Sequence, residues 1–120
     1  MNKANGRLPN SLNAVANKQD YLARLQLAVS QLHNCGAVWR ESVPVTEIFR
    51  GKTLWQGDVE VFDLTGHPKA KRAFGWSHPE GADNKGERFV AVLEIPPVDS
   101  PQTAVKISIV SDIKAGKIKP

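Results

Sequence analysis

Two stretches of the sequence, residues 37–49 and 71–78, concentrate the side chains that could bind a ligand or transfer a proton. In the first, AVWRESVPVTEIF, every second residue shares one face of a predicted strand, and that face carries Trp39, Glu41 and Glu47. In the second, KRAFGWSH, the same alternation gives one face to Arg72, Phe74, Trp76 and His78. We expect both faces to point toward the protein interior.

The acidic side chains of the first stretch need partners if they lie inside the protein. An unpaired buried carboxylate is destabilising or shifts its pKa upward. Arg72 and His78 are the partners that the pattern offers to Glu41 and Glu47. The sequence therefore predicts a pocket between a helix and the concave face of a sheet. Its predicted ligand-binding residues are Trp39, Glu41, Glu47, Arg72, Trp76 and His78.

A pocket of this composition suits a small ligand that is partly aromatic or cationic. Tryptophan rings, including that of Trp55, can stack on the ligand, and a carboxylate can hold its positive group. A catalytic alternative pairs a buried glutamate of raised pKa with a neutral His78 for acid–base chemistry. The competing interpretation is that Pro44 marks a bulge, which returns Glu47 to solvent, and that Glu41 lies at the rim of the sheet.

A further alternative is a homodimeric interaction module. The stretch TAVKISIVSDI, residues 103–113, alternates like a fifth strand, with Val105, Ile107 and Ile109 on one side. An edge strand of this kind, or the outer face of the sheet, can pair with a second copy across a two-fold axis. Pro44 marks the first strand as a protected edge, so the fifth strand is predicted to be the available one.

The elements that must position these residues are one helix followed by strands. Apolar residues recur at helical spacing between Leu22 and Leu32, and Gly36 stops the pattern, so a helix is predicted from about 18 to 35. The period then changes to two, and the links between strands are short, which favours an antiparallel meander. The predicted fold class is α+β, with one N-terminal helix packed on a curved antiparallel sheet of four to five strands. The predicted strands are 37–49, 54–64, 71–78, 88–95 and 103–113.

This order of elements resembles the cystatin-like arrangement, in which a curved antiparallel sheet grips a helix. The resemblance covers only the number and order of elements, so it implies no activity. The chain as a whole also resembles the small bacterial proteins carried on mobile integron gene cassettes, and this resemblance likewise implies no chemistry. The sequence holds no glycine-rich phosphate loop, nucleophile elbow, CxxC pair or HExxH motif. Phosphoryl transfer, serine hydrolysis, thiol redox chemistry and zinc proteolysis therefore have no support in the sequence.

The chain length of 120 residues predicts a single domain. We expect a flexible tail over 1–16, one α+β domain over 17–113 and a basic tail over 114–120. The net charge is +4, but residues 1–18 and 114–120 hold six of the 16 basic residues and no acid, which leaves ten basic against 12 acidic residues between them. The positive charge therefore belongs to the ends of the chain, and nucleic-acid binding is not favoured.

Several functional classes have no residues to carry them. No apolar run approaches the roughly 20 residues of a membrane span, and the N-terminus has no apolar region typical of a secretory signal, so we expect a cytoplasmic protein. The single cysteine, Cys35, agrees with a reducing compartment. His33, His67 and His78 fall on a predicted helix, a loop and a strand end without ligand spacing. No metal and no cofactor are predicted.

Overall fold

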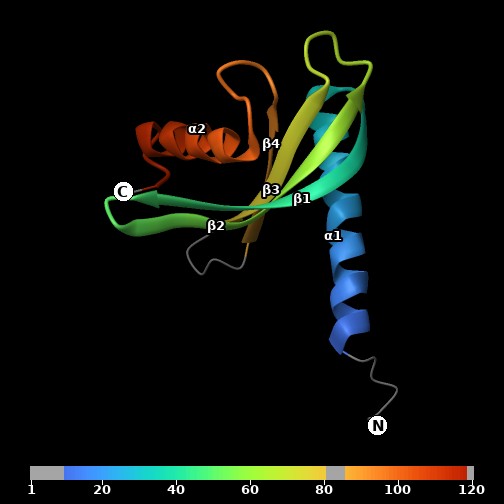
Figure 1. Ribbon diagram of the computed structural model, residues 1–120, viewed down its shortest axis with the longest axis horizontal. Helices are drawn as coiled ribbons and strands as arrows, with labels where there is room; N and C mark the ends of the chain where they lie inside the picture. Colours follow the sequence, from blue (N-terminus) through green and yellow to red (C-terminus); the bar gives the residue numbers. More distant parts are fainter. Residues whose placement is uncertain (1–9, 81–85, 119–120) are drawn as a thin grey trace.

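The computed structural model describes residues 10–80 and 86–118, in which two helices accompany a four-stranded sheet (Figure 1). The strands form one antiparallel meander in the order β1-β2-β3-β4. The α+β class, with an N-terminal helix and an antiparallel sheet, is confirmed. The elements are α1 (Asn10–His33), β1 (Gly36–Phe49), β2 (Lys52–Thr65), β3 (Arg72–Glu80), β4 (Gly86–Leu93) and α2 (Pro101–Lys114).

Helix α1 is longer than the sequence pattern predicts. It begins at Asn10 rather than near residue 18, and its residues include no proline or glycine that would break the backbone ladder. Leu25 and Val29 are fully buried, as the apolar spacing predicts. The helix ends before Asn34, whose φ of 52° lies in the left-handed region. Residues 1–9 of the predicted flexible tail and 119–120 of the basic tail lie outside the described residues. Within the described part, no helix is both long and apolar enough to cross a membrane.

The predicted fifth strand is wrong, because residues 101–114 form helix α2. Ser100 caps its start: its side chain accepts a hydrogen bond from the backbone N–H of Thr103, and the Thr103 side chain accepts one from the backbone N–H of Ser100. Pro101 follows in the first turn, where its fixed φ favours a helix. The residues buried by α2 are Ala104, Val105, Ile109 and Asp112. These four residues recur at helical spacing, and their burial decides the structure of the segment although its apolar residues also alternate as in a strand.

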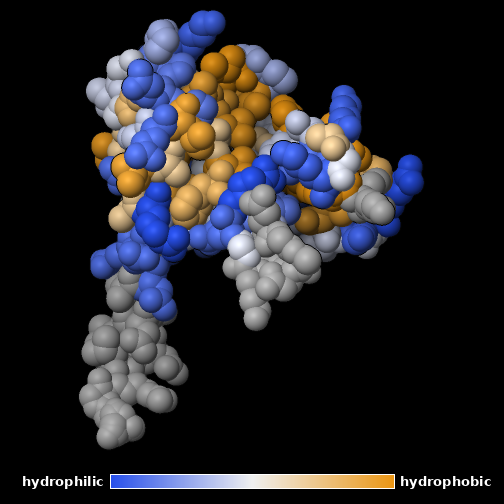
Figure 2. All heavy atoms as spheres, turned by 180° about the vertical axis from the view of Figure 1, so that it is seen from behind, coloured by the Kyte–Doolittle hydropathy of each residue, from blue (hydrophilic) through white to orange (hydrophobic). Residues whose placement is uncertain are grey.

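The sheet is covered on both faces, and each face has its own hydrophobic cluster. One cluster contains Leu25 of α1 with Phe62 and Ala73. The other contains Phe74 and Trp76 with residues of α2. Seen from behind, apolar side chains gather between the two helices (Figure 2). The prediction that Phe74 and Trp76 face the N-terminal helix is therefore wrong. The alternation grouped the residues of β3 correctly, but α2 covers the face that carries the tryptophan.

Strands β2 and β3 pair over only part of their length. The ladder joins residues 60–63 to residues 72–75, although both strands are longer. Beyond this ladder, the β1–β2 hairpin diverges from the other strands as an arm, while β3 stays paired with β4 (Figure 1). Trp55 of the arm reaches back to β3, where its Nε1 donates to the Ser77 carbonyl oxygen at 3.3 Å. We call the opening between residues 54–58 and 77–79 the split.

Side chains cap the open edge of β1. The alternation of the ladder directs the carbonyl groups of Ala37 and Thr46 away from β2. Gln26 of α1 donates from Nε2 to the Ala37 oxygen at 2.7 Å, and Gln102 of α2 donates to the Thr46 oxygen at 3.2 Å. Between them lies Pro44, which has no N–H to offer a further strand. The predicted protection of this edge by a proline is thus reinforced by both helices.

The edge of β4 is capped in the same way. The ladder leaves the Ala91 carbonyl on the open side of β4, and His33 of α1 donates to it from Nε2 at 3.0 Å. Because residues 103–113 are helical, they provide no fifth-strand edge for pairing with a second copy. Homodimerisation stays a prediction. The prediction that a strand over residues 103–113 mediates it is wrong, because these residues lie in α2.

The close approach of α1 to β3 gives a first test. A Cβ added at Gly75 would lie 3.2 Å from a methyl carbon of Leu25, which is fully buried and has little room to move. We expect Gly75→Ala to lower the free energy of unfolding by about 1–3 kcal/mol through overpacking. Urea denaturation would measure this loss of unfolding free energy. Gly36→Ala is the matched control, since the nearest atom to its added Cβ is 3.4 Å away and its effect should be close to zero. Equal stabilities of the two variants would contradict this packing.

Candidate functional site

A pocket of about 580 Å³ opens at the split, between α1 and the diverging strands. Helix α1 contributes two residues, β2 a run that includes Gln56 and Gly57, and β3 the three residues 77–79 near its end. The pocket therefore exists because the β1–β2 arm leaves the sheet while α1 continues across the gap. Its lining residues are Lys18, Tyr21, Leu54, Trp55, Gln56, Gly57, Asp58, Glu60, Ser77, His78 and Pro79.

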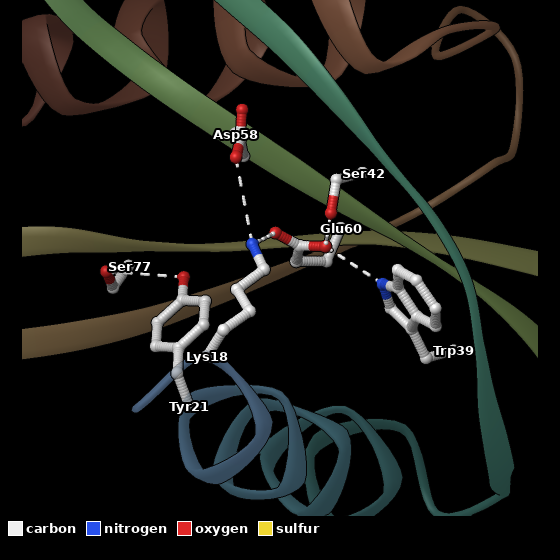
Figure 3. A network of polar contacts seen from close by, with 7 residues as sticks. All are labelled: Lys18, Tyr21, Trp39, Ser42, Asp58, Glu60 and Ser77. Carbon is white, nitrogen blue, oxygen red and sulfur yellow. Dashed lines mark hydrogen bonds and ion pairs between the residues drawn. The ribbon is translucent and has the colours of Figure 1, made fainter. Parts of the chain in front are cut away.

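The base of the pocket is the carboxylate of Glu60, which is fully buried. Lys18 of α1 approaches Oε2 with Nζ at 2.6 Å, and the other oxygen accepts from Trp39 Nε1 at 2.9 Å and from the Ser42 hydroxyl at 2.5 Å (Figure 3). A buried carboxylate needs several such donors, because the free energy lost when the charge is removed from water is otherwise not offset. Glu60 is thus fully engaged within the protein, and its role is to position its neighbours.

Lys18 lies between two carboxylates. Its Nζ is 3.7 Å from Asp58 Oδ2 as well as 2.6 Å from Glu60 (Figure 3). Burial alone lowers the pKa of Lys18, but the hydrogen bond that it donates to Glu60 and the charges of Glu60 and Asp58 outweigh that effect, so the pKa is raised above 10.5. Lys18 is therefore a fixed positive charge and not a candidate base.

Two aromatic side chains, Tyr21 and Trp55, line the pocket beside the ion pair. The Tyr21 hydroxyl lies 3.4 Å from the Ser77 hydroxyl oxygen. Burial raises the pKa of Tyr21 above 10.0, the Ser77 hydrogen bond opposes this, and the charges of Glu60 and Glu87 add to the rise. Tyr21 therefore carries its proton at neutral pH and can act as a hydrogen-bonding group.

His78 contributes an imidazole whose orientation can be assigned. Its Nδ1 lies 2.8 Å from the Pro79 carbonyl oxygen, and a carbonyl can only accept. Nδ1 therefore carries the hydrogen, which leaves Nε2 of the neutral ring as an acceptor. Together with the carboxylate of Asp58, whose side chain is 52% exposed, this acceptor favours ligands that donate hydrogen bonds.

Of the six residues predicted to bind a ligand, His78 lines the pocket and Trp39 contacts its base. Trp39 donates to Glu60, although the residue as a whole remains 42% exposed. Trp76 does not line the pocket: it is buried in the cluster on the α2 side of the sheet and forms a tilted pair with Trp55. The residue thus supports the pocket from behind instead of lining it.

The remaining three predicted residues lie away from the pocket. Glu41 is exposed, with Arg40 Nε 4.0 Å from its carboxylate. Glu47 is buried but accepts a hydrogen bond from Gln102 of α2 at 2.8 Å. Arg72 pairs with Asp63 at 3.5 Å. The register shift after Trp39 puts Glu41 and Glu47 on the opposite face of β1 from Trp39, so an alternation counted through the whole strand groups the three side chains incorrectly. The predicted pairing of Glu41 or Glu47 with Arg72 and His78 does not occur.

The pocket residues missed by the sequence analysis had weaker signals. Glu60 shares the alternate positions of β2 with Phe62 and Leu64, so its burial could have been inferred from period two. Lys18 and Tyr21 are three residues apart and therefore share a helix face. Nothing in the sequence shows that β2 diverges from β3, and the pocket depends on that divergence.

Comparison of the chain with protein-family models, with curated proteins and with solved structures finds no match. The resemblance to integron gene-cassette proteins therefore stays a prediction. Across residues 10–80 and 86–118, no group of three or more His, Cys, Asp or Glu side chains is arranged to hold a metal ion. The function has to be inferred from the geometry of the pocket.

The buried ion pair predicts an asymmetry between two substitutions. Lys18→Met leaves the Glu60 carboxylate buried without its cation and should cost about 3 kcal/mol of unfolding free energy. Glu60→Gln keeps a carbonyl oxygen for Trp39 and Ser42 and should cost less. The double variant should be more stable than Lys18→Met alone, because no uncompensated charge remains. Chemical denaturation of the three variants measures this, and a double variant less stable than both singles would refute the pairing.

The ionisation of Tyr21 offers a direct pH test. Tyr21 is the only tyrosine in the sequence, so ultraviolet absorbance follows its titration without interference from another tyrosine. We expect a midpoint above 10.0, and Glu87→Gln should lower it by removing a nearby negative charge. Since the raised pKa keeps the proton on the folded state, the free energy of unfolding should fall as the pH rises above about 10. A midpoint at or below 10.0 would contradict the burial of this phenol.

Proposed function

We propose that the protein binds a small, partly aromatic and positively charged ligand in the pocket at the split. The observation that carries the proposal is the carboxylate of Asp58, which is half-exposed in a pocket whose other charges already form a close pair. The proposal assigns the pocket a binding role and no reaction.

The charge balance of the pocket favours a cation. Lys18 carries one positive charge, and the Glu60 and Asp58 carboxylates carry two negative charges. Because Glu60 lies 2.6 Å from Lys18 and Asp58 lies 3.7 Å from it, most of the uncompensated charge belongs to Asp58. A ligand ammonium or guanidinium group beside Asp58 would neutralise the site.

The size and surface of the pocket favour an aromatic component. A volume of about 580 Å³ lies in the range of small-molecule sites, roughly 300–1,000 Å³. Tyr21, Trp55 and His78 provide flat rings, and such rings contact both aromatic groups and cations favourably. The polar groups that would fix the orientation of the ligand are Asp58 and His78 Nε2.

The test is a titration with tyramine and tryptamine, each of which joins an aromatic ring to an ammonium group. Isothermal calorimetry should show saturable binding of at least one of them. Asp58→Asn should weaken it about tenfold, equivalent to about 1.4 kcal/mol, by removing the charge that holds the ammonium. Asp63→Asn is the matched control: it removes one carboxylate from the same strand, but Asp63 pairs with Arg40 and Arg72 outside the pocket. Equal losses in the two variants would refute the proposal.

A further inference from the structure

Among residues 10–80 and 86–118, strand β2 has no backbone partner along the part of its edge that lines the pocket. Leu64 N–H donates at 2.8 Å to the carbonyl of Lys71, the residue before β3, so the even-numbered residues of β2 direct their backbone groups toward β3. The ladder stops at Glu60, and the next two even positions are Asp58 and Gln56. Their N–H and C=O groups therefore face the split, and both residues line the pocket.

The opposite side of the split is already capped by side chains. Extending the β2–β3 ladder by two residues would set Ser77 against Asp58. Instead, the Ser77 carbonyl accepts from Trp55 Nε1, and the Pro79 carbonyl accepts from His78 Nδ1. Pro79 has no N–H to donate. Strand β3 is thus prevented from closing onto β2, and the edge of β2 stays open toward the pocket.

Gly57 lies between the two edge residues, and the Trp55 ring packs against it. A Cβ at Gly57 would lie 3.1 Å from the Trp55 ring, so glycine leaves room for the indole to pack over the strand between Gln56 and Asp58. The indole lies on the face of β2 that carries Gly57, and its Nε1 reaches across the split to the Ser77 carbonyl. An edge of this kind, next to a pocket with ring-bearing side chains, is the arrangement that binds extended peptides by strand addition.

We propose that the ligand is a short extended peptide segment that pairs with β2 at Gln56 and Asp58 and carries a positive group toward the Asp58 carboxylate. This inference rests on the proposed function and specifies its ligand. The backbone edge supplies two donors and two acceptors in strand spacing, which a simple aromatic amine cannot use. The positive group is either the N-terminal ammonium of the segment or a lysine or arginine side chain within it.

The experiment compares peptides with the amines already named. The probes are the full set of dipeptide amides built from the common amino acids, screened by calorimetry, each with a free or an acetylated N-terminus. We expect the best dipeptide amide to bind at least tenfold more tightly than tyramine or tryptamine. Loss of binding on acetylation would assign the positive group to the N-terminus, and retention would assign it to a basic side chain.

Backbone pairing is tested by removing one hydrogen bond at a time. Replacing the central amide of the best dipeptide by an ester removes its N–H and should weaken binding about fivefold to tenfold. Gln56→Pro removes the backbone N–H that faces the split. It breaks no hydrogen bond to β1, because the backbone groups of Gln56 point away from that strand. This substitution should weaken binding of the dipeptide at least tenfold and leave the affinity for the amines unchanged.

The matched control is Thr46→Pro, which places a proline on the cross-strand partner of Gln56 with its nitrogen facing away from the pocket. This variant should bind the dipeptide normally, and circular dichroism would compare the folding of the two proline variants. If Gln56→Pro does not fold, the ester comparison in the natural chain decides. Amines that bind as tightly as every dipeptide would overturn the peptide inference alone, and failure of all probes would overturn the proposed function with it.

Discussion

The buried carboxylate of Glu60 is the constraint on which the arrangement of the other elements depends. It has no exposure to solvent, so donors must come to it from more than one element, and they come from α1 through Lys18 and from β1 through Trp39 and Ser42. Glu60 is also the last residue of β2 that pairs with β3. A single carboxylate therefore fixes the height of α1 over the sheet at the point where the sheet divides.

Division of the sheet explains why two helices are needed. The β1–β2 arm buries its apolar side chains against α2, whereas the paired strands also bury a face against α1. A sheet covered on both sides presents apolar residues in both alternate sets, as Phe62 and Val61 show by their nearly complete burial. The polar pocket occupies the position where neither helix fills the space between the diverging strands.

The same double coverage marks the limit of the sequence analysis. Elements with a strong local pattern were predictable: the spacing of Leu25 and Val29 identified α1, and short links identified the meander. The segment from Pro101 onward has both an alternating and a helical pattern, and its capping residue Ser100 was the signal for the helix. Side-chain direction in β1 could not be counted through its two register shifts. His78 was found because it shares the alternate positions of a predicted strand with Arg72 and Trp76, whereas Asp58 becomes a pocket residue only through the long-range divergence of two strands.

The capped strand edges have a consequence for the behaviour of the protein in a crowded solution. Open edges of antiparallel sheets are templates for intermolecular pairing, which leads to aggregation and fibril growth. Here the edge carbonyls of Ala37, Thr46 and Ala91 are occupied by side chains of the two helices. Partial unfolding that releases α1 would uncover the carbonyls of Ala37 and Ala91 together, because both accept hydrogen bonds from that helix. Colloidal stability of the protein is thus coupled to the docking of its N-terminal helix.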